Sequence, residues 1–407
     1  MLFVGGLVLV LGGAAVGVPG LVALGVIVCG LAIARTIWTA AGSEVVSYRR
    51  DLGSDRAVCG DEIDLDIRVR NRGPLPLPWV RTVDWLGHGV AVGHRLHPDR
   101  EPAKGELAAG WTLGPFETVV RHFRILTDRR GAYELGPVTV SAGDLLGRSM
   151  PLAGVEARAR YVVRPRMVGV FGFDEARDWD GDRRARHGLA EDPSRYAGVR
   201  PYRLGDPLRR IHWRASARSP VPLSRRYDPS RRPDVVLVLD LRLPTGPGYG
   251  PAERDETTEG LMVATMSLAR SLHGDGTAVG LATTGFSGDP NKTLFLTPSA
   301  TPGGIGLIGD VLARLDGIPA ISMPRLLGEV SRRVVPGTTI VTIGAVDPAP
   351  FLPALRGLAR SGFLVSHLAY GDGGAALAER ARAAGVAARS ARLDGPWATS
   401  SRLELAG

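Results

Sequence analysis

No charged side chain occurs in the first 34 residues, and this feature limits what the chain can fold into more than any other. A bilayer core about 30 Å thick requires roughly 20 apolar residues in a helix. The run is therefore too long for one straight span and long enough for two short ones. Gly17-Val18-Pro19-Gly20 stands where such a hairpin would turn. We expect an N-terminal transmembrane helical hairpin over residues 1–41, with helices at about 2–16 and 21–41.

Basic residues next to this run predict where the rest of the chain lies. Arg35, Arg49 and Arg50 follow the run, and no basic side chain precedes it. By the positive-inside rule the body is then cytoplasmic, whether the chain crosses once or twice. A cleaved signal peptide is the competing interpretation, but it requires a positively charged start and a short apolar core. We expect a multi-pass protein of the cell membrane with a cytoplasmic body.

Cysteine content and charge narrow the classes of protein further. Cys29 and Cys59 are the only cysteines, and Cys29 lies inside the apolar run, so no disulfide framework is available. The formal net charge is +9, and residues 156–232 alone hold 19 Arg against 10 Asp and Glu. An acidic partner would meet this arginine-rich segment first.

Residues 45–163 have the pattern of a β domain. Ile63, Leu65 and Ile67 alternate with charged residues, which is typical of a strand with one buried face. Further short apolar runs follow, separated by Gly and Pro turns, and we find no convincing amphipathic helix between them. We expect an immunoglobulin-like β-sandwich.

Residues 233–395 alternate between strand and helix patterns. Val235–Leu239 is a continuous apolar run, as in a strand buried on both faces of a parallel sheet. Helices are expected near 253–273, 305–315, 325–334, 351–360 and 375–384, with strands near 278–283, 293–296, 339–343 and 364–369. This pattern predicts a Rossmann-type α/β domain. Residues 396–407 are expected to form a tail.

The connector, residues 164–232, carries the most informative motif. Gly205-Asp206 is typical of a turn or helix N-cap, and Pro207 suits the first helical position. We expect a short helix after it, with Leu208, Ile211 and Ala215 toward a core and arginines outward. The candidate structural or partner-binding residues are Arg200, Tyr202, Gly205, Asp206, Arg210, Ile211, His212, Trp213, Arg214, Ser216, Ala217 and Arg218.

Three interpretations of this motif remain open. The first is a structural or protein-docking surface, in which Ile211 and Trp213 are apolar anchors. The second is a nucleic-acid surface, with arginines on phosphates and Tyr196, Tyr202 and Trp213 stacking on bases. The third is catalysis with His212 as a base beside Ser216, but no nucleophile elbow or oxyanion pattern surrounds the pair.

The same motif carries a resemblance to a known family. The run RPYRLGDPLRRIHWRASAR, followed by LSRRYD, resembles the signature of the bacterial family called domain of unknown function 58. Upstream, RRGAYELGPVTVSAGDLLGRS resembles the β domain of that family. The resemblance implies a membrane-anchored protein with a von Willebrand factor A-like C-terminal domain. It also implies two partners, a MoxR-type AAA+ ATPase and a transglutaminase-like membrane protein, and no established reaction.

A metal-binding von Willebrand factor A domain would present Asp-x-Ser-x-Ser after its first strand, because Mg²⁺ prefers hard oxygen ligands. Here those positions are Asp240, Arg242 and Pro244. Arg242 would repel a cation and Pro244 has no side-chain oxygen. We therefore expect a degenerate metal site, with Asp240 capping a loop or pairing with an arginine, and neither metal nor cofactor.

These inferences predict a non-enzymatic, membrane-anchored adaptor or scaffold that works with a MoxR-type ATPase in complex assembly or cell-envelope processes. Binding of nucleic acid is not expected. The alternative is a nucleic-acid-binding or hydrolytic protein that uses His212, Arg214 and Arg218.

Overall fold

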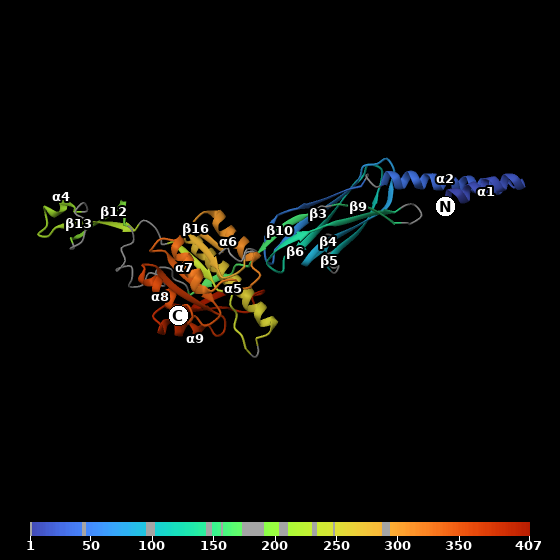
Figure 1. Cartoon of the computed structure of the whole chain (residues 1–407). Helices are drawn as coiled ribbons and strands as arrows, with labels where there is room; N and C mark the ends of the chain where they lie inside the picture. Colours follow the sequence, from blue (N-terminus) through green and yellow to red (C-terminus); the bar gives the residue numbers. More distant parts are fainter. Residues whose placement is uncertain are drawn as a thin grey trace. The chain divides into compact units, whose positions relative to one another are not determined.

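The computed structural model describes residues 2–42, 46–94, 102–143, 149–155, 158–172, 191–202, 211–229, 234–246, 249–286 and 294–407. The chain divides into two compact units, 1–164 and 165–407 (Figure 1). Within the described ranges, the first unit contains two helices and ten strands, and the second holds an eight-stranded sheet with its helices. The chain is therefore multidomain and rich in β-structure.

Two apolar helices open the first unit, α1 (Leu2–Val16) and α2 (Pro19–Gly42). They turn at Gly17, whose φ of +73° suits glycine, and Pro19 provides the first residue of α2. The helices approach each other at glycines. A Cβ on Gly6 would lie 2.7 Å from the Cys29 Sγ, and a Cβ on Gly25 would lie 2.6 Å from the backbone nitrogen of Val10.

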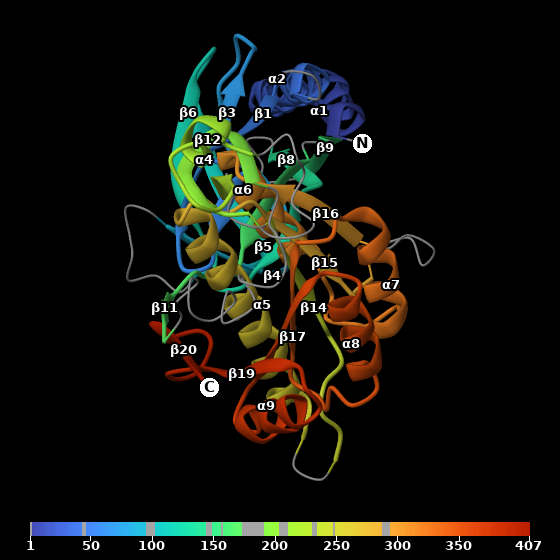
Figure 2. The ribbon, with the colours of Figure 1, turned by 90° about the vertical axis from the view of Figure 1, so that its left-hand side faces the viewer.

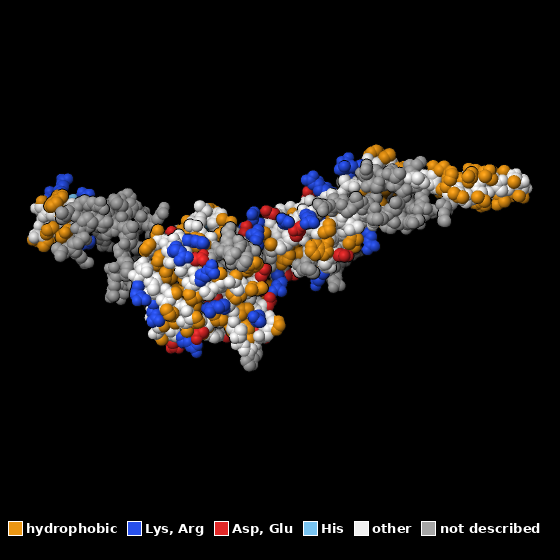
Figure 3. Space-filling model, in the orientation of Figure 1, with side chains coloured by type: hydrophobic (Ala, Val, Ile, Leu, Met, Phe, Trp, Pro, Cys, Tyr) orange, Lys and Arg blue, Asp and Glu red, His pale blue; other side chains and the backbone are white. Residues whose placement is uncertain are grey.

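The outward sides of these helices are apolar. Phe3, Leu11 and Ile27 are among the exposed large side chains, and Figure 3 shows hydrophobic atoms over this surface. In the part of the chain that the structure describes, no helix is both long and apolar enough to span a membrane.

The β part of the first unit consists of two sheets. Seven strands form one sheet in the order β1-β3-β6-β4-β8-β9, with β5 paired to β4, and β2-β10-β7 form the other. Period-two burial is confirmed in β3, where Ile63, Leu65, Ile67 and Val69 are buried between exposed or half-buried neighbours. The strands are β1 (Val46–Leu52), β2 (Arg56–Val58), β3 (Glu62–Asn71), β4 (Leu77–His94), β5 (Ala103–Leu113), β6 (Thr118–Leu126), β7 (Gly131–Leu135), β8 (Val138–Gly143), β9 (Ser149–Val155) and β10 (Ala159–Arg164).

The second unit is built on one sheet in the order β11-β20-β19-β18-β17-β14-β15-β16. Strands β14, β15, β17, β18 and β19 are parallel to their neighbours in this set, whereas β16 and β20 pair antiparallel. The strands are β11 (Gly169–Phe171), β14 (Val235–Leu239), β15 (Val279–Thr283), β16 (Leu294–Ser299), β17 (Thr339–Gly344), β18 (Leu364–Tyr370), β19 (Ala387–Leu393) and β20 (Arg402–Ala406).

Helices cover both faces of this sheet (Figure 2). Helices α7, α8 and α9 bury Leu327, Leu355 and Ala381 in one core with Val236 and Val238 of β14. Helix α5 lies on the other face with α6 beside it. The helices are α5 (Pro251–Gly274), α6 (Pro302–Arg314), α7 (Met323–Arg333), α8 (Leu352–Arg360) and α9 (Gly374–Ala383), so every expected helix and strand from 235 to 384 is present.

Two parts of the predicted division differ from the structure. The expected tail, 396–407, contains β20, which pairs antiparallel with β19. The expected connector contains β11, which pairs with β20 through Gly169 and Arg402. Both segments therefore belong to the α/β sheet, because strands distant in sequence supply their hydrogen bonds.

Candidate functional site

The arginine-rich motif is built on a two-stranded hairpin of β12 (Glu191–Pro201) and β13 (Leu223–Pro229). Between these strands, Ile211 forms a bridge with Ser224, and the chain then enters the four-residue helix α4 (Trp213–Ser216). Ile211 is 7% exposed and Ser224 is fully buried. The motif is therefore anchored by strand pairing at its centre.

His212 and Ser216 hold this turn together. The backbone N–H of His212 donates to the Leu223 carbonyl (2.8 Å), and its Nδ1 accepts from the backbone N–H of Ala215 (3.1 Å). The Ser216 hydroxyl donates to the His212 carbonyl (3.1 Å) and accepts from the Leu223 N–H (2.8 Å). The His212 side chain thus caps α4, and the Ser216 side chain closes the loop to Leu223. These contacts correspond to the first of the three interpretations, a structural role.

The predicted helix after Pro207 is confirmed at Trp213–Ser216 and is wrong at Ile211 and His212. Ile211 pairs with a strand, and the helix begins only at Trp213, with His212 as its N-cap. The backbone N–H of His212 is already used by β13, so a longer helix through this position would break a strand contact. Trp213 is also 71% exposed, so it is not the expected buried anchor.

Exposed residues of α4 and of the two positions after it form a surface that we call the Trp213 face, which consists of Trp213, Arg214, Ala217 and Arg218. Neither Arg214 nor Arg218 makes an ion pair with any described residue. Of the remaining candidates, Tyr202 donates its backbone N–H to the Pro222 carbonyl (2.8 Å), and Arg200 donates to the Pro201 carbonyl (3.3 Å). Gly205, Asp206 and Arg210 lie outside the described residues.

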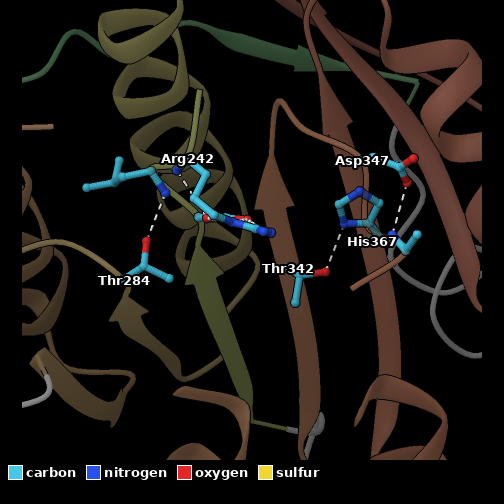
Figure 4. A network of polar contacts seen from close by, with 8 residues as sticks. Arg242, Thr284, Thr342, Asp347 and His367 are labelled. Carbon is cyan, nitrogen blue, oxygen red and sulfur yellow. Dashed lines mark hydrogen bonds and ion pairs between the residues drawn. The ribbon is translucent and has the colours of Figure 1, made fainter. Parts of the chain in front are cut away.

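A second polar cluster lies at the carboxyl end of β14 (Figure 4). Asp240 is 1% exposed, and its carboxylate accepts hydrogen bonds from Arg242, at 3.0 Å from Nε and 2.6 Å from Nη2. The same carboxylate accepts the backbone N–H of Arg242 at 3.1 Å. Asp240 therefore both caps its loop and pairs with an arginine. The hydrogen bond to Asp240 raises the pKa of the Arg242 guanidinium.

The guanidinium of Arg242 stands where a cation would have to bind Asp240. A metal would need to displace a charge-assisted, bidentate contact, and position 244 offers no replacement ligand. Within the described ranges, no group of three or more His, Cys, Asp or Glu residues is placed to hold a metal ion. The residues at this site therefore favour the ion pair between Asp240 and Arg242 over a bound metal ion.

His367 is a buried polar residue that the sequence reasoning missed. It is fully buried in β18, and its Nδ1 lies 2.9 Å from the Thr342 hydroxyl on β17, while the Phe351 ring meets it edge-on. Burial lowers its pKa to about 4, and the contact with Thr342 opposes this shift. A histidine within the apolar run of a central strand was the signal available in the sequence.

The fold and the site together define a multidomain protein in which a β-rich unit precedes an α/β unit that carries an arginine-rich turn. The family model described as "Protein of unknown function DUF58" matches residues 198–294, a range that holds both the Trp213 face and Asp240. This match agrees with the family resemblance carried by the arginine-rich motif. The chain is also 24% identical over 238 residues to "Uncharacterized protein YeaD" of Bacillus subtilis (strain 168), which covers 58% of this chain and 55% of that protein.

Solved structures with weak similarity were also found. The CARDB domain of the PF1109 protein from Pyrococcus furiosus is 16% identical, covering 30% of this chain and 93% of that one with a TM-score of 0.20. The second type II cohesin module of the adaptor ScaA scaffoldin from Acetivibrio cellulolyticus is 8% identical, covering 27% and 91% with a TM-score of 0.21.

Proposed function

We propose that this protein is a non-enzymatic, membrane-anchored adaptor that captures a protein partner with the Trp213 face. The partner suggested by the family resemblance is a MoxR-type AAA+ ATPase, with a transglutaminase-like membrane protein as a second member of the assembly. In this proposal the α/β unit is a von Willebrand factor A-like domain whose metal position is filled by Arg242.

The separation of the motif into a fixed frame and an exposed face is the observation that carries the proposal. Ile211, His212 and Ser216 make the turn, whereas Trp213, Arg214 and Arg218 point to solvent. Trp and Arg are the residues most enriched among those that dominate binding energy at protein interfaces. A turn already held by its own hydrogen bonds loses little conformational entropy when a partner binds.

Charge indicates which partner surface would fit. Residues 198–226 contain eight arginines, and Asp206 is their only acidic residue. Guanidinium groups bind carboxylates through paired N–H donors, which gives directional contacts. The expected partner surface therefore combines carboxylates with an apolar pocket for the indole ring.

Membrane attachment is proposed through α1 and α2, with the body in the cytoplasm. Support comes from the uncharged run of 34 residues and from the exposed apolar side chains along both helices. Soluble proteins rarely expose a large contiguous apolar surface without a partner or a membrane to cover it.

The test compares the affinity of full-length protein in detergent for the purified MoxR-type ATPase from the same genome. Removing a residue that dominates an interface costs about 2 kcal/mol or more, which weakens binding about 30-fold. We expect such losses for Trp213→Ala and for the double variant Arg214→Ala/Arg218→Ala. Arg356→Ala, which removes an exposed arginine on α8, is the matched control and should bind as the wild type does.

Three results would contradict the proposal. Equal affinities for the wild type and the Trp213→Ala variant would exclude the Trp213 face as the docking surface. A folded His212→Gln variant that loses cellular activity while it binds the ATPase with native affinity would indicate chemistry at this motif. Salt-dependent binding of an oligonucleotide, lost in the arginine double variant, would favour the nucleic-acid alternative.

A further inference from the structure

One end of the β part of the first unit has an unusual surface, formed by two neighbouring turns. We call residues 72–76 and 114–117 the proximal tip. Asn71 is fully buried and joins the two turns. Its amide nitrogen donates to the carbonyls of Leu75 (2.7 Å) and Gly114 (2.8 Å), and its amide oxygen accepts from the Gly73 N–H (2.9 Å).

Phe116 is the conspicuous member of this tip. Its side chain is 59% exposed, and its φ of +56° makes it the only described residue other than glycine with a positive φ. Its backbone N–H donates to the Gly73 carbonyl (3.1 Å), which fixes this conformation. Such a backbone is strained for a bulky residue, whereas Gly or Asn would adopt it more easily.

The topology places this tip at the end of the sheet where the chain arrives from α2. Val46, the first residue of β1, pairs with Asn71, and the Asn71 N–H donates to the Glu117 carbonyl (2.9 Å). Four Cα–Cα steps, at most about 15 Å, separate Val46 from the last residue of α2, Gly42. Phe116 thus lies at the end of the β part nearest in the chain to the apolar helices.

The distances bring this tip within reach of a bilayer if α1 and α2 enter one. The seven residues of α2 after Arg35 rise about 10 Å, and the polar layer on each side of a bilayer core is roughly 5–8 Å thick. The tip also has the composition of an interfacial surface. Pro74, Pro115 and Phe116 are exposed beside the cation Arg72, and the Glu117 carboxylate is held by the N–H of Gly114.

We infer that the proximal tip rests in the lipid headgroup layer, with Phe116 inserted as an aromatic anchor and Arg72 facing lipid phosphates. This second contact would fix the β part against the membrane instead of leaving it free on its tether. The inference depends on the proposed membrane attachment through α1 and α2. It adds Phe116 as a lipid-binding residue of the folded body. This residue has a strained backbone, and its side chain is left exposed by the described residues.

A photoreactive aromatic residue tests this contact with little change in shape. The full-length protein carries p-benzoylphenylalanine in place of Phe116 and is reconstituted into vesicles of phosphatidylethanolamine and phosphatidylglycerol. The matched control carries the same residue in place of Trp85, another exposed aromatic, which lies eight residues further along β4 from its proximal end at Leu77. After irradiation, mass spectrometry measures the fraction of protein that has gained one phospholipid.

We expect a several-fold larger fraction of lipid adduct from position 116 than from position 85. Replacing Arg72 by Glu should lower the fraction of lipid adduct formed from position 116. Equal adducts at both positions in protein that floats with the vesicles would overturn this inference and leave the proposed attachment intact. Protein that does not float with the vesicles would overturn both. A crosslink from position 116 to another protein, without lipid adduct, would overturn the inference in favour of a protein contact.

Discussion

The buried imidazole of His367 predicts a measurable loss of stability in acid. Burial lowers its pKa to about 4 in the folded protein, whereas its ordinary value is 6.5. Well above pH 6.5 the imidazole is neutral in both states and adds no pH dependence. As the pH falls below 6.5, the unfolded chain takes up a proton that the folded protein does not. The linkage between these pKa values lowers the free energy of unfolding by about 2 kcal/mol at pH 5 and about 3 kcal/mol at pH 4.

The assay is urea unfolding of the full chain in detergent, followed through hydrogen exchange of peptides from β17 and β18. His367→Phe keeps a ring of similar size, and the Thr342 hydroxyl retains the Ser366 carbonyl as an acceptor (3.3 Å). The difference in unfolding free energy between wild type and variant should be constant from pH 8 to 7 and should then shift by about 3 kcal/mol in favour of the variant by pH 4. A difference that stays constant down to pH 4 would refute the reasoning.

Three further outcomes follow from the contacts described above. Millimolar Mg²⁺ should leave the Tm nearly unchanged, since Arg242 already fills the metal position beside Asp240. A cation at a hundred times its Kd would raise the free energy of unfolding by about 2.7 kcal/mol. A rise in Tm of several degrees that Asp240→Asn abolishes would therefore contradict this prediction. Ile211→Ala should destabilise the hairpin of β12 and β13 by about 2 kcal/mol, seen as faster hydrogen exchange in β13, whereas Trp213→Ala should leave the exchange rate unchanged. Asn71→Ala leaves two tip carbonyls without their donor and should cost about 1–3 kcal/mol or more, measured as a lower Tm of the first unit; an unchanged Tm would show that water replaces the amide.

Periodicity was sufficient for the regular parts of the fold. Val235–Leu239 is buried at every position, as a central parallel strand requires, and α7 follows its expected range within two residues. These elements are specified by their own residues, because burial repeats at the spacing of the backbone. The pairing of Asp240 with an arginine was also predictable, since the residue types at 240 and 242 are complementary and lie two apart.

The parts that sequence reasoning missed depend on partners far away in the chain. Strand β11 has only three residues and is formed by pairing with β20, more than 200 residues later. Trp213 was expected to be buried because it is large and apolar, but its position is decided by the hydrogen bond between His212 and Leu223. No local pattern encodes such a contact. His367 was missed because a single polar residue in an apolar strand does not change its period.

The order of strands in the second unit has a consequence for the arginine-rich motif. Strand β11 lies five positions from β14 across the sheet. The two strands run in opposite directions, so β11 ends at the same end of the sheet at which β14 begins. Five strand spacings amount to about 24 Å, which roughly eight extended residues can bridge. The chain uses residues 172–234 for this crossover, so most of its length is surplus to closing the sheet. We therefore expect that a short linker in place of residues 191–229 would leave the α/β unit able to fold, and that the corresponding segment of a related protein could be inserted into the same crossover.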